Sequence, residues 1–415
     1  GQIHVRHGGD PWRLVRARDS DVHRRCDAQA VVMPRGKMSQ SPDLRAAIDA
    51  GSLMEASNEQ GYAHFLEHLS FRGSKYVADG EAKRIWQRLG ATFGSDSNAQ
   101  TSQTQTIYSL DLPQARPAAI EESLRILSGM MAAPTISATE VEAERRTVMA
   151  EARERDGAQM RVQNAMLQLF FAGQPLANRS PIGTSDSLSA ATPVSLRAFH
   201  DRWYRPDNMV LAISGDVDPA QIIPLITKYF GDWKPAHAGP VPPSDFGTPK
   251  ANAPTSAFLV EPGLPTSISM AWIWPWVQRD DTIALNQGRL VGFIAQRILN
   301  RRLETLARSG SSFLDADVQQ DDVARSADIT QIAITPANGD WPAALAEVRS
   351  LVADALTRPP SQSEVDRETA ESKAMLDVQV ETTRAEASAK QADDLIEAVN
   401  IRETIASAEV AVDVL

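Results

Sequence analysis

The chain has 415 residues, a net charge of −11 and a single cysteine, Cys26. Its length exceeds what one compact core usually holds and predicts two or three domains. The acidic charge argues against a nucleic-acid partner, because phosphate contacts need a basic surface. One cysteine excludes an internal disulfide and a thiolate metal site, so a bound metal would need histidine and carboxylate ligands. No segment approaches the roughly 18 apolar residues of a membrane span, so no membrane partner is expected.

The first part of the chain mixes predicted strands with predicted helices. Apolar and polar residues alternate at 44–50 and 105–112, which is typical of half-buried strands. Ser137 and Glu140 form a capping-box pattern, and the lack of proline up to Ala172 predicts one long helix over 137–172. The remaining predicted elements are helices at 61–71, 81–89, 114–133 and 219–230 and a strand at 209–214.

A segment rich in Pro, Ala, Gly and Ser, residues 234–254, predicts a linker. Beyond it the pattern predicts strands at 257–260, 267–272 and 329–334, a helix of about 25 residues, and two further helices, the last beginning at Ser361. This order loosely repeats the first part, so we predict an α+β fold with two related domains, 1–233 and 255–415. The pattern stops at Leu415 without a polar tail, which suggests that more protein follows.

The most specific feature is the pentad His64-Phe-Leu-Glu67-His68. On a helix, residues i and i+4 lie one turn apart on one face, so both imidazoles can reach one metal ion. Glu67, at i+3, falls beside them and can activate a water molecule without being a ligand. This order of residues is the signature of the inverted zincins. The alternative is an amphipathic helix whose two histidines are merely exposed or packed.

A catalytic zinc site needs a third protein ligand and an open position. The predicted helix after Ser137 offers Glu144 and Glu151, which are seven residues and therefore close to two turns apart on one face. One carboxylate can bind the metal while the other supports a ligand. Taken alone, a glutamate pair on such a charged helix is usually a solvated surface.

Three segments around the pentad, 46–55, 60–69 and 71–75, together resemble the pitrilysin/insulinase family of metallopeptidases. Members of this family bind zinc through the two histidines of HxxEH and a distal glutamate of an E-x6-E helix. The resemblance implies domains of the roll type, each a mainly antiparallel sheet packed against helices.

The same resemblance assigns roles to the candidate residues. It implies that His64, His68 and Glu151 bind Zn²⁺ and that Glu144 is the supporting carboxylate. Glu67 would be the general base that deprotonates the zinc-bound water.

Weaker matches follow in the family's order along the chain. Asn98 and Ala99 lie in an N-A-x-T segment like the family's, an edge strand onto which the substrate backbone pairs, so both are candidate substrate-binding residues. The later matches are residues 181–183, 203–209, 215–218 and 296–303. Residues 1–30 lack the family's usual opening strand, and only 31–34 resemble it.

These features predict a zinc-dependent endopeptidase that hydrolyses peptides or small unfolded proteins. The family works as two halves, and no counterpart of the other half's Arg/Tyr pair is found, so activity is expected to need a C-terminal half or a homologous partner subunit. Two alternatives are a non-catalytic, zinc-binding subunit that holds peptides, and a zinc site unrelated to proteolysis. The export of long bacterial relatives suggests a periplasmic location, with the cytoplasm as the alternative.

Overall fold

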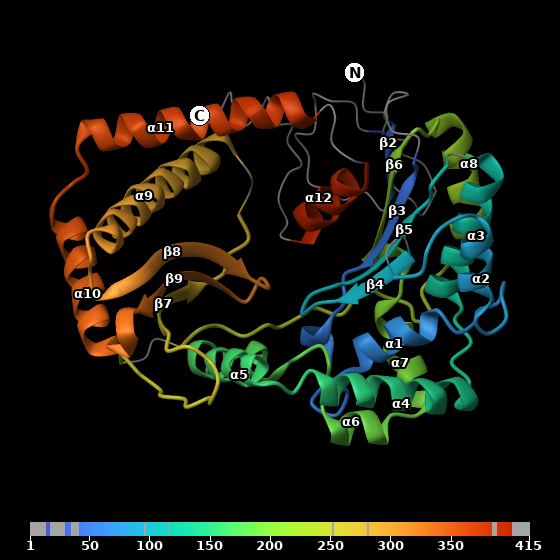
Figure 1. Cartoon of the computed structure of the whole chain (residues 1–415). Coiled ribbons are helices and arrows are strands. Elements are labelled where there is room, and N and C mark those ends of the chain that lie inside the picture. The colour runs from blue at the N-terminus through green and yellow to red at the C-terminus, as the bar shows by residue number, and fades with distance from the viewer. Residues whose placement is uncertain are drawn as a thin grey trace. The chain divides into compact units, whose positions relative to one another are not determined.

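The computed structural model describes residues 14–16, 30–34, 41–94, 97–114, 116–250, 253–279, 282–383 and 388–400. They divide into two compact units, whose elements are labelled in Figure 1. The first unit contains the described residues of 1–156, 178–245 and 385–405, and the second contains those of 157–177, 246–384 and 406–415.

This division differs from the predicted domains in two places. Residues 157–177, expected in the first domain, belong to the second unit, and residues 385–405, expected in the second domain, belong to the first unit. Between 231 and 267 the described residues contain no helix or strand, and the expected linker 234–254 lies in this stretch. Each unit therefore includes a segment that the simple order of the sequence assigns to the other.

A six-stranded sheet lies at the centre of the first unit, in the order β1-β2-β6-β3-β5-β4. β3 pairs antiparallel with β5 and β6, β4 pairs antiparallel with β5, and β1–β2 and β2–β6 are parallel. The strands are β1 (Leu14–Arg16), β2 (Ala30–Pro34), β3 (Asp43–Ile48), β4 (Ser97–Thr101), β5 (Thr106–Asp111) and β6 (Met209–Gly215). The strands predicted at 44–50, 105–112 and 209–214 are thus confirmed, and β4 lies at an edge of the sheet.

β3 is more deeply buried than its alternating sequence predicts. All six of its residues are buried. Ala47 packs against Leu395 and Ile396 of α12 (Ser388–Asn400), so a helix covers the face that was expected to meet solvent. Arg45 is buried on this strand because Asp111 and Asp393 pair with its guanidinium group at 2.5 and 2.6 Å.

The other helices of the first unit agree with most of the predicted ones. They are α1 (Tyr62–Ser70), α2 (Glu81–Arg88), α3 (Pro117–Ala132), α4 (Ala138–Glu154), α6 (Ser185–Ala190), α7 (Pro193–Trp203) and α8 (Pro219–Phe230), with short 3-10 turns at Ser52–Met54 and Pro206–Asn208. In the part of the chain that the structure describes, no helix combines the length and the hydrophobicity needed to cross a bilayer.

The single helix predicted over 137–172 is wrong, because the chain breaks between α4 and α5 (Ala158–Phe170). The start is as predicted: the Glu140 N–H donates to Ser137 Oγ, and the Ser137 N–H donates to the Glu140 carboxylate. The break falls at Gly157, whose backbone is extended with φ −99° and ψ 170°. Glycine is a weak helix former, and at this point the chain passes from the first unit to the second.

The second unit has a three-stranded antiparallel sheet in the order β7-β9-β8. Its core contains Leu303, Phe313, Ile332 and Val348, which come from the sheet and two helices. The elements are β7 (Ile268–Pro275), β8 (Phe313–Val323), β9 (Ala327–Pro336), α9 (Ile283–Arg308), α10 (Trp341–Thr357), α11 (Gln362–Thr383) and α5, with 3-10 turns at Pro175–Asn178, which ends in the first unit, and Ala337–Gly339.

One predicted strand of this unit is wrong. Residues 257–260 form no strand, and Phe258 and Val260 are 81% and 70% exposed. The apolar run has the composition of a strand, but no neighbouring strand pairs with it among the described residues. Composition without a pairing partner therefore gave a false prediction.

The two units repeat one order of strands and helices. β5 lies between β3 and β4 in the first unit, as β9 lies between β7 and β8 in the second. Helices α3, α4 and α5 follow β5 as α10, α11 and α12 follow β9. The exchanged helices α5 and α12 hold the same place in this repeat, and each belongs to the other unit. The predicted α+β class, with helices packed on mainly antiparallel sheets, is confirmed.

Candidate metal centre

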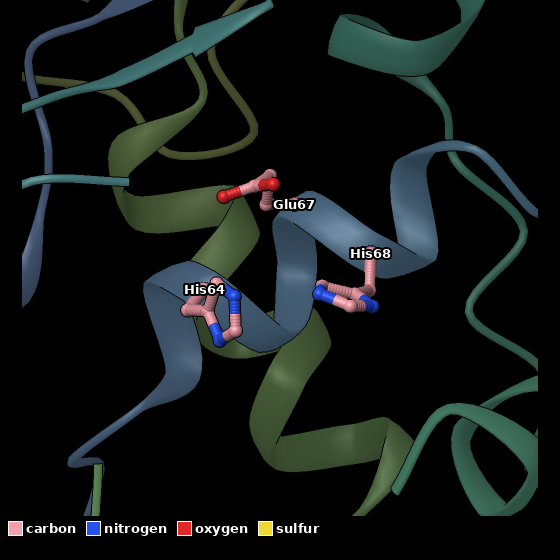
Figure 2. Close-up of side chains that lie close together, drawn as sticks. All are labelled: His64, Glu67 and His68. Atoms are coloured by element: carbon pink, nitrogen blue, oxygen red, sulfur yellow. The ribbon is translucent and has the colours of Figure 1, made fainter. Parts of the chain in front are cut away.

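Helix α1 brings the three chemical residues of the pentad to one place. Figure 2 shows His64, Glu67 and His68 with their side chains close together on this helix. One nitrogen or oxygen atom from each lies within 4.8 Å of the other two. Because α1 is helical throughout, the i, i+3, i+4 spacing gives the shared face predicted from the sequence.

The beginning of α1 is fixed by a buried carboxylate that the sequence analysis did not single out. Glu55 accepts hydrogen bonds from the backbone N–H groups of Gly61 and Ala63, both at 2.9 Å. Burial raises the pKa of Glu55 well above its ordinary value, against the lowering effect of these two hydrogen bonds. Gly61 has φ +91°, and a Cβ there would lie 2.9 Å from the Cα of Gly183, so the close approach of the two loops requires glycine.

Glu151 on α4 lies opposite the two histidines. Its Oε2 atom is 3.6 Å from His64 Nε2 and 3.5 Å from His68 Nε2. Two ligands of a tetrahedral zinc ion, each about 2.1 Å from it, lie about 3.4 Å apart. Two imidazoles and one carboxylate at these distances fit the donor set and the size of a zinc site.

Further charged groups surround these three side chains. Glu144 Oε2 lies 3.1 Å from His68 Nδ1, and its other oxygen lies 3.2 Å from the guanidinium of Arg72. Arg155 forms an ion pair with the oxygen of Glu151 that points away from the histidines. Because an Nδ1–H that donates to Glu144 leaves Nε2 of His68 unprotonated, Glu144 is placed to select the tautomer that binds a metal.

The two histidines have opposite pKa shifts. Burial, with smaller effects of His68 and Arg155, lowers the pKa of His64 to about 3, so its ring is neutral near pH 7. Burial also acts to lower the pKa of His68, but the hydrogen bond to Glu144 and the surrounding carboxylates raise it overall. The site therefore holds one imidazole that is neutral near pH 7 and one whose affinity for a proton is raised by the neighbouring carboxylates.

Glu67 is 8% exposed and turns toward the edge strand. Its Oε2 atom accepts a hydrogen bond of 2.6 Å from Thr101 Oγ1 at the end of β4. Burial raises the pKa of Glu67, although the Thr101 hydrogen bond opposes this. A carboxyl group with a raised pKa can both accept and return a proton near neutral pH. The contact with Thr101 was not predicted, although this residue ends the N-A-x-T segment.

Asn98 and Ala99 do not join this cluster directly. They lie on β4, three and two residues before Thr101. The Asn98 side chain is exposed, and its Oδ1 accepts a hydrogen bond of 2.9 Å from the Ala99 N–H. In the described part of the chain β4 pairs only with β5, so its other edge offers backbone groups to an extended peptide.

Two family models match consecutive parts of the chain. The model for insulinase (peptidase family M16) matches residues 31–180, and the model for the peptidase M16 inactive domain matches residues 190–371. The pentad and both glutamates of α4 lie in the first match, and the whole sheet of the second unit lies in the second.

Curated relatives include named zinc proteases. The probable zinc protease PqqL of Escherichia coli is 34% identical over 196 residues, which cover 47% of this chain and 21% of the relative. The probable zinc protease PqqL of Haemophilus influenzae is 28% identical over 274 residues, which cover 66% of this chain and 30% of the relative. The matches thus span less than a third of the length of either relative.

A solved structure shows the same fold. The first half of the periplasmic protease PqqL from Escherichia coli superposes with a TM-score of 0.85 at 21% identity, covering 99% of this chain and 85% of that one. The fold of this chain is therefore found in a known structure.

Proposed function

We propose that this chain, which belongs to the insulinase family of peptidases (family M16), is the metal-binding half of a zinc-dependent endopeptidase. The observation that carries the proposal is the convergence of His64, His68 and Glu151, with Glu67 beside the imidazoles but held toward Thr101. The first three would bind the zinc ion, and Glu67 would remain available for proton transfer.

The chemistry follows from these positions. A bound zinc ion would polarise the scissile carbonyl and make a water molecule more acidic. Glu67 would accept a proton from the attacking water and give it to the leaving amine. Because Thr101 occupies Oε2 of Glu67, the proton would move through Oε1. Glu144 would act indirectly, by orienting His68 through its Nδ1 atom.

We further propose that peptides bind along the free edge of β4, at Asn98 and Ala99. An extended peptide added to this edge would gain main-chain hydrogen bonds with little demand on its sequence. The peptide backbone would then run beside β4, which ends at Thr101. Because Thr101 contacts Glu67, the peptide would pass close to the proposed general base. This placement supports peptides or unfolded segments as substrates.

The matched part of the chain covers 21% and 30% of the two PqqL relatives, so the complete enzyme would contain more protein than this chain. We infer that a C-terminal half or a homologous subunit completes it. The likeness of this chain to the first half of PqqL supports this inference. The same neighbour is described as periplasmic, which supports a periplasmic location here.

The test combines metal content with cleavage of a quenched fluorescent peptide library. Glu67→Gln should retain zinc and lose at least about 100-fold in cleavage rate, since it keeps the shape but cannot transfer the proton. Glu151→Gln should lose zinc, whereas Glu154→Gln, on the exposed side of the same helix, should change neither. Retained zinc in both Glu151→Gln and His68→Ala would contradict the assignment of these residues as zinc ligands. Zinc without any cleavage, even after the C-terminal half or partner subunit is added, would favour the non-catalytic, peptide-holding subunit.

A further inference from the structure

The two units place equivalent helices in contact. α1 packs against α4 in the first unit and α9 against α11 in the second, where Figure 1 shows α11 running along α9. α4 and α11 hold the same place in the repeat, and both begin with a serine cap, Ser137 with Glu140 and Ser361 with Glu364. The caps give a common starting point from which positions on the two helices can be matched.

Counting from the caps aligns the glutamates of α4 with residues of α11. Glu144 and Glu368 each lie seven residues after the cap. Glu151 lies fourteen residues after its cap, and the residue at that distance on α11 is Met375. The supporting carboxylate thus has a counterpart in the second unit, whereas the ligand position holds a thioether.

α9 repeats the spacing of the pentad with different chemistry. Arg297, Asn300 and Arg301 have the i, i+3, i+4 spacing of His64, Glu67 and His68. Asn300 turns toward β8, where its Oδ1 accepts a hydrogen bond of 2.7 Å from the Val318 N–H. Glu67 turns toward β4 in the same way, and β4 and β8 are equivalent strands.

The contacts across the helix pair agree with this alignment. Arg301 forms an ion pair with Glu368, as His68 contacts Glu144. Arg297 Nη1 lies 3.8 Å from Met375 Sδ, at the place where His64 Nε2 lies 3.6 Å from Glu151 Oε2 in the first unit.

Glu368 is the centre of the arrangement. It is fully buried, at 0% exposure, and accepts hydrogen bonds from Arg297 Nε at 3.1 Å and from both Nε and Nη2 of Arg301. Glu371, one turn further along, also pairs with both arginines, but its side chain is 44% exposed. A fully buried carboxylate needs compensating positive charge. Here Arg297 and Arg301 supply it from α9, and Arg367 on α11 adds a third guanidinium group at 3.3 Å.

We propose that the α9–α11 contact is a counterpart of the metal site in which Arg297 and Arg301 take the place of the two histidines and of the cation. The guanidinium groups join α11 to α9 through Glu368, and the second unit binds no zinc there. The inference uses the proposed zinc site for comparison, so the experiment is designed to separate the two.

The experiment asks whether ligands can be restored at the matched positions. In a His68→Ala background, which disables the first site, Arg297→His, Arg301→His and Met375→Glu are introduced together. Titration with Co²⁺ and zinc is expected to give one tightly bound ion per chain with the visible absorption of tetrahedral cobalt. The matched control carries the two histidines and retains Met375, and should bind at least 10-fold more weakly. A folded triple variant that binds no ion would overturn the inference. Failure of the proposed function appears separately, as an unsubstituted chain without zinc.

A second measurement does not need the redesigned site to fold. Glu368→Gln and Glu371→Gln remove one charge each from the same helix. Glu368→Gln is expected to lower the melting temperature of the metal-free chain by several degrees, and by at least twice the effect of Glu371→Gln, because it leaves both arginines without their buried partner. Equal effects would mean that Glu368 does not hold the pair, and the inference would fail.

Discussion

The α1–α4 contact of the first unit and the α9–α11 contact of the second pack equivalent helices together, but the balance of charged side chains between the helices is opposite. In the first, Glu67, Glu144 and Glu151 surround two imidazoles, one of which is neutral near pH 7. In the second, the carboxylates of α11 meet the guanidinium groups of α9 directly. The first contact has negative charge in excess, and the second supplies its own positive charge.

The two contacts differ in which charge is left unpaired, and the proposed metal binding depends on that difference. Arg72 and Arg155 lie at the outside of the first site, where each pairs with one oxygen of a glutamate and leaves the other facing the histidines. In the second unit, Arg297 and Arg301 lie between the helices and pair with Glu368. Under the proposed function, a few side chains therefore decide whether such a helix pair binds metal.

The strongest response should follow the removal of zinc by a chelator. At free zinc about 1,000-fold above its dissociation constant, binding adds about 4 kcal/mol to the stability of the folded first unit. Removing zinc should therefore speed hydrogen exchange in α1 and α4 and leave α9 and α11 unchanged. Exchange measured by mass spectrometry tests this, with Glu151→Gln as the chelator-insensitive control. Equal loss of protection in both helix pairs would contradict the proposed difference between them.

A smaller effect is expected from pH in the metal-free chain. The pKa of His64 falls from 6.5 unfolded to about 3 folded, so below pH 6.5 the unfolded state binds the proton more readily and stability falls. Between pH 6.5 and 4.5 the loss is about 2 kcal/mol. The stabilising contribution of His68, whose folded pKa is raised, is already complete below its unfolded pKa of 6.5.

Urea unfolding at several pH values tests this slope. His64→Gln should flatten it, whereas His200→Gln, which replaces a buried histidine of the same unit away from the site, should leave it in place. An unchanged slope in His64→Gln would show that other groups cause the acid sensitivity.

A still smaller effect is expected from the hydrogen bonds that join each helix to a strand, Glu67 with Thr101 and Asn300 with Val318. Thr101→Val removes the hydrogen bond to Glu67 and should lower kcat about 10-fold, or about 1.4 kcal/mol, with little change in KM. Thr101→Ser should restore most of the rate. Asn300→Leu removes the corresponding contact of the second unit and should change stability alone. A fall in kcat with unchanged KM in the Asn300→Leu variant would contradict this division of roles.

Much of the candidate site could be predicted because it depends on helical spacing. His64 and His68 are one turn apart on α1, and Glu144 and Glu151 two turns apart on α4, so the two shared faces follow from local structure. That these faces meet is a tertiary fact, which only the resemblance to a family suggested. The hydrogen bond from Thr101 to Glu67 joins residues 34 positions apart and carries no local signal.

The failed predictions also have physical causes. The helix predicted over 137–172 breaks at Gly157 because the chain enters the other unit there, which no local pattern reveals. The face of β3 at Arg45 and Ala47 was expected to meet solvent, but α12 covers it from far along the chain. The strand expected at 257–260 had the right composition and no partner.

The position of α12 in the first unit also sets a timetable for protein synthesis. The last strand of the sheet ends at Gly215, and α12 begins 173 residues later, at Ser388. At about 5–20 residues per second, the ribosome needs roughly 9–35 s to cover this distance. During that time Ala47 and Ala212 of the sheet have no covering helix, and the buried cation Arg45 lacks its partner Asp393. The unit that carries the proposed metal site is therefore completed late, and the nascent chain presents an apolar sheet face to chaperones until then.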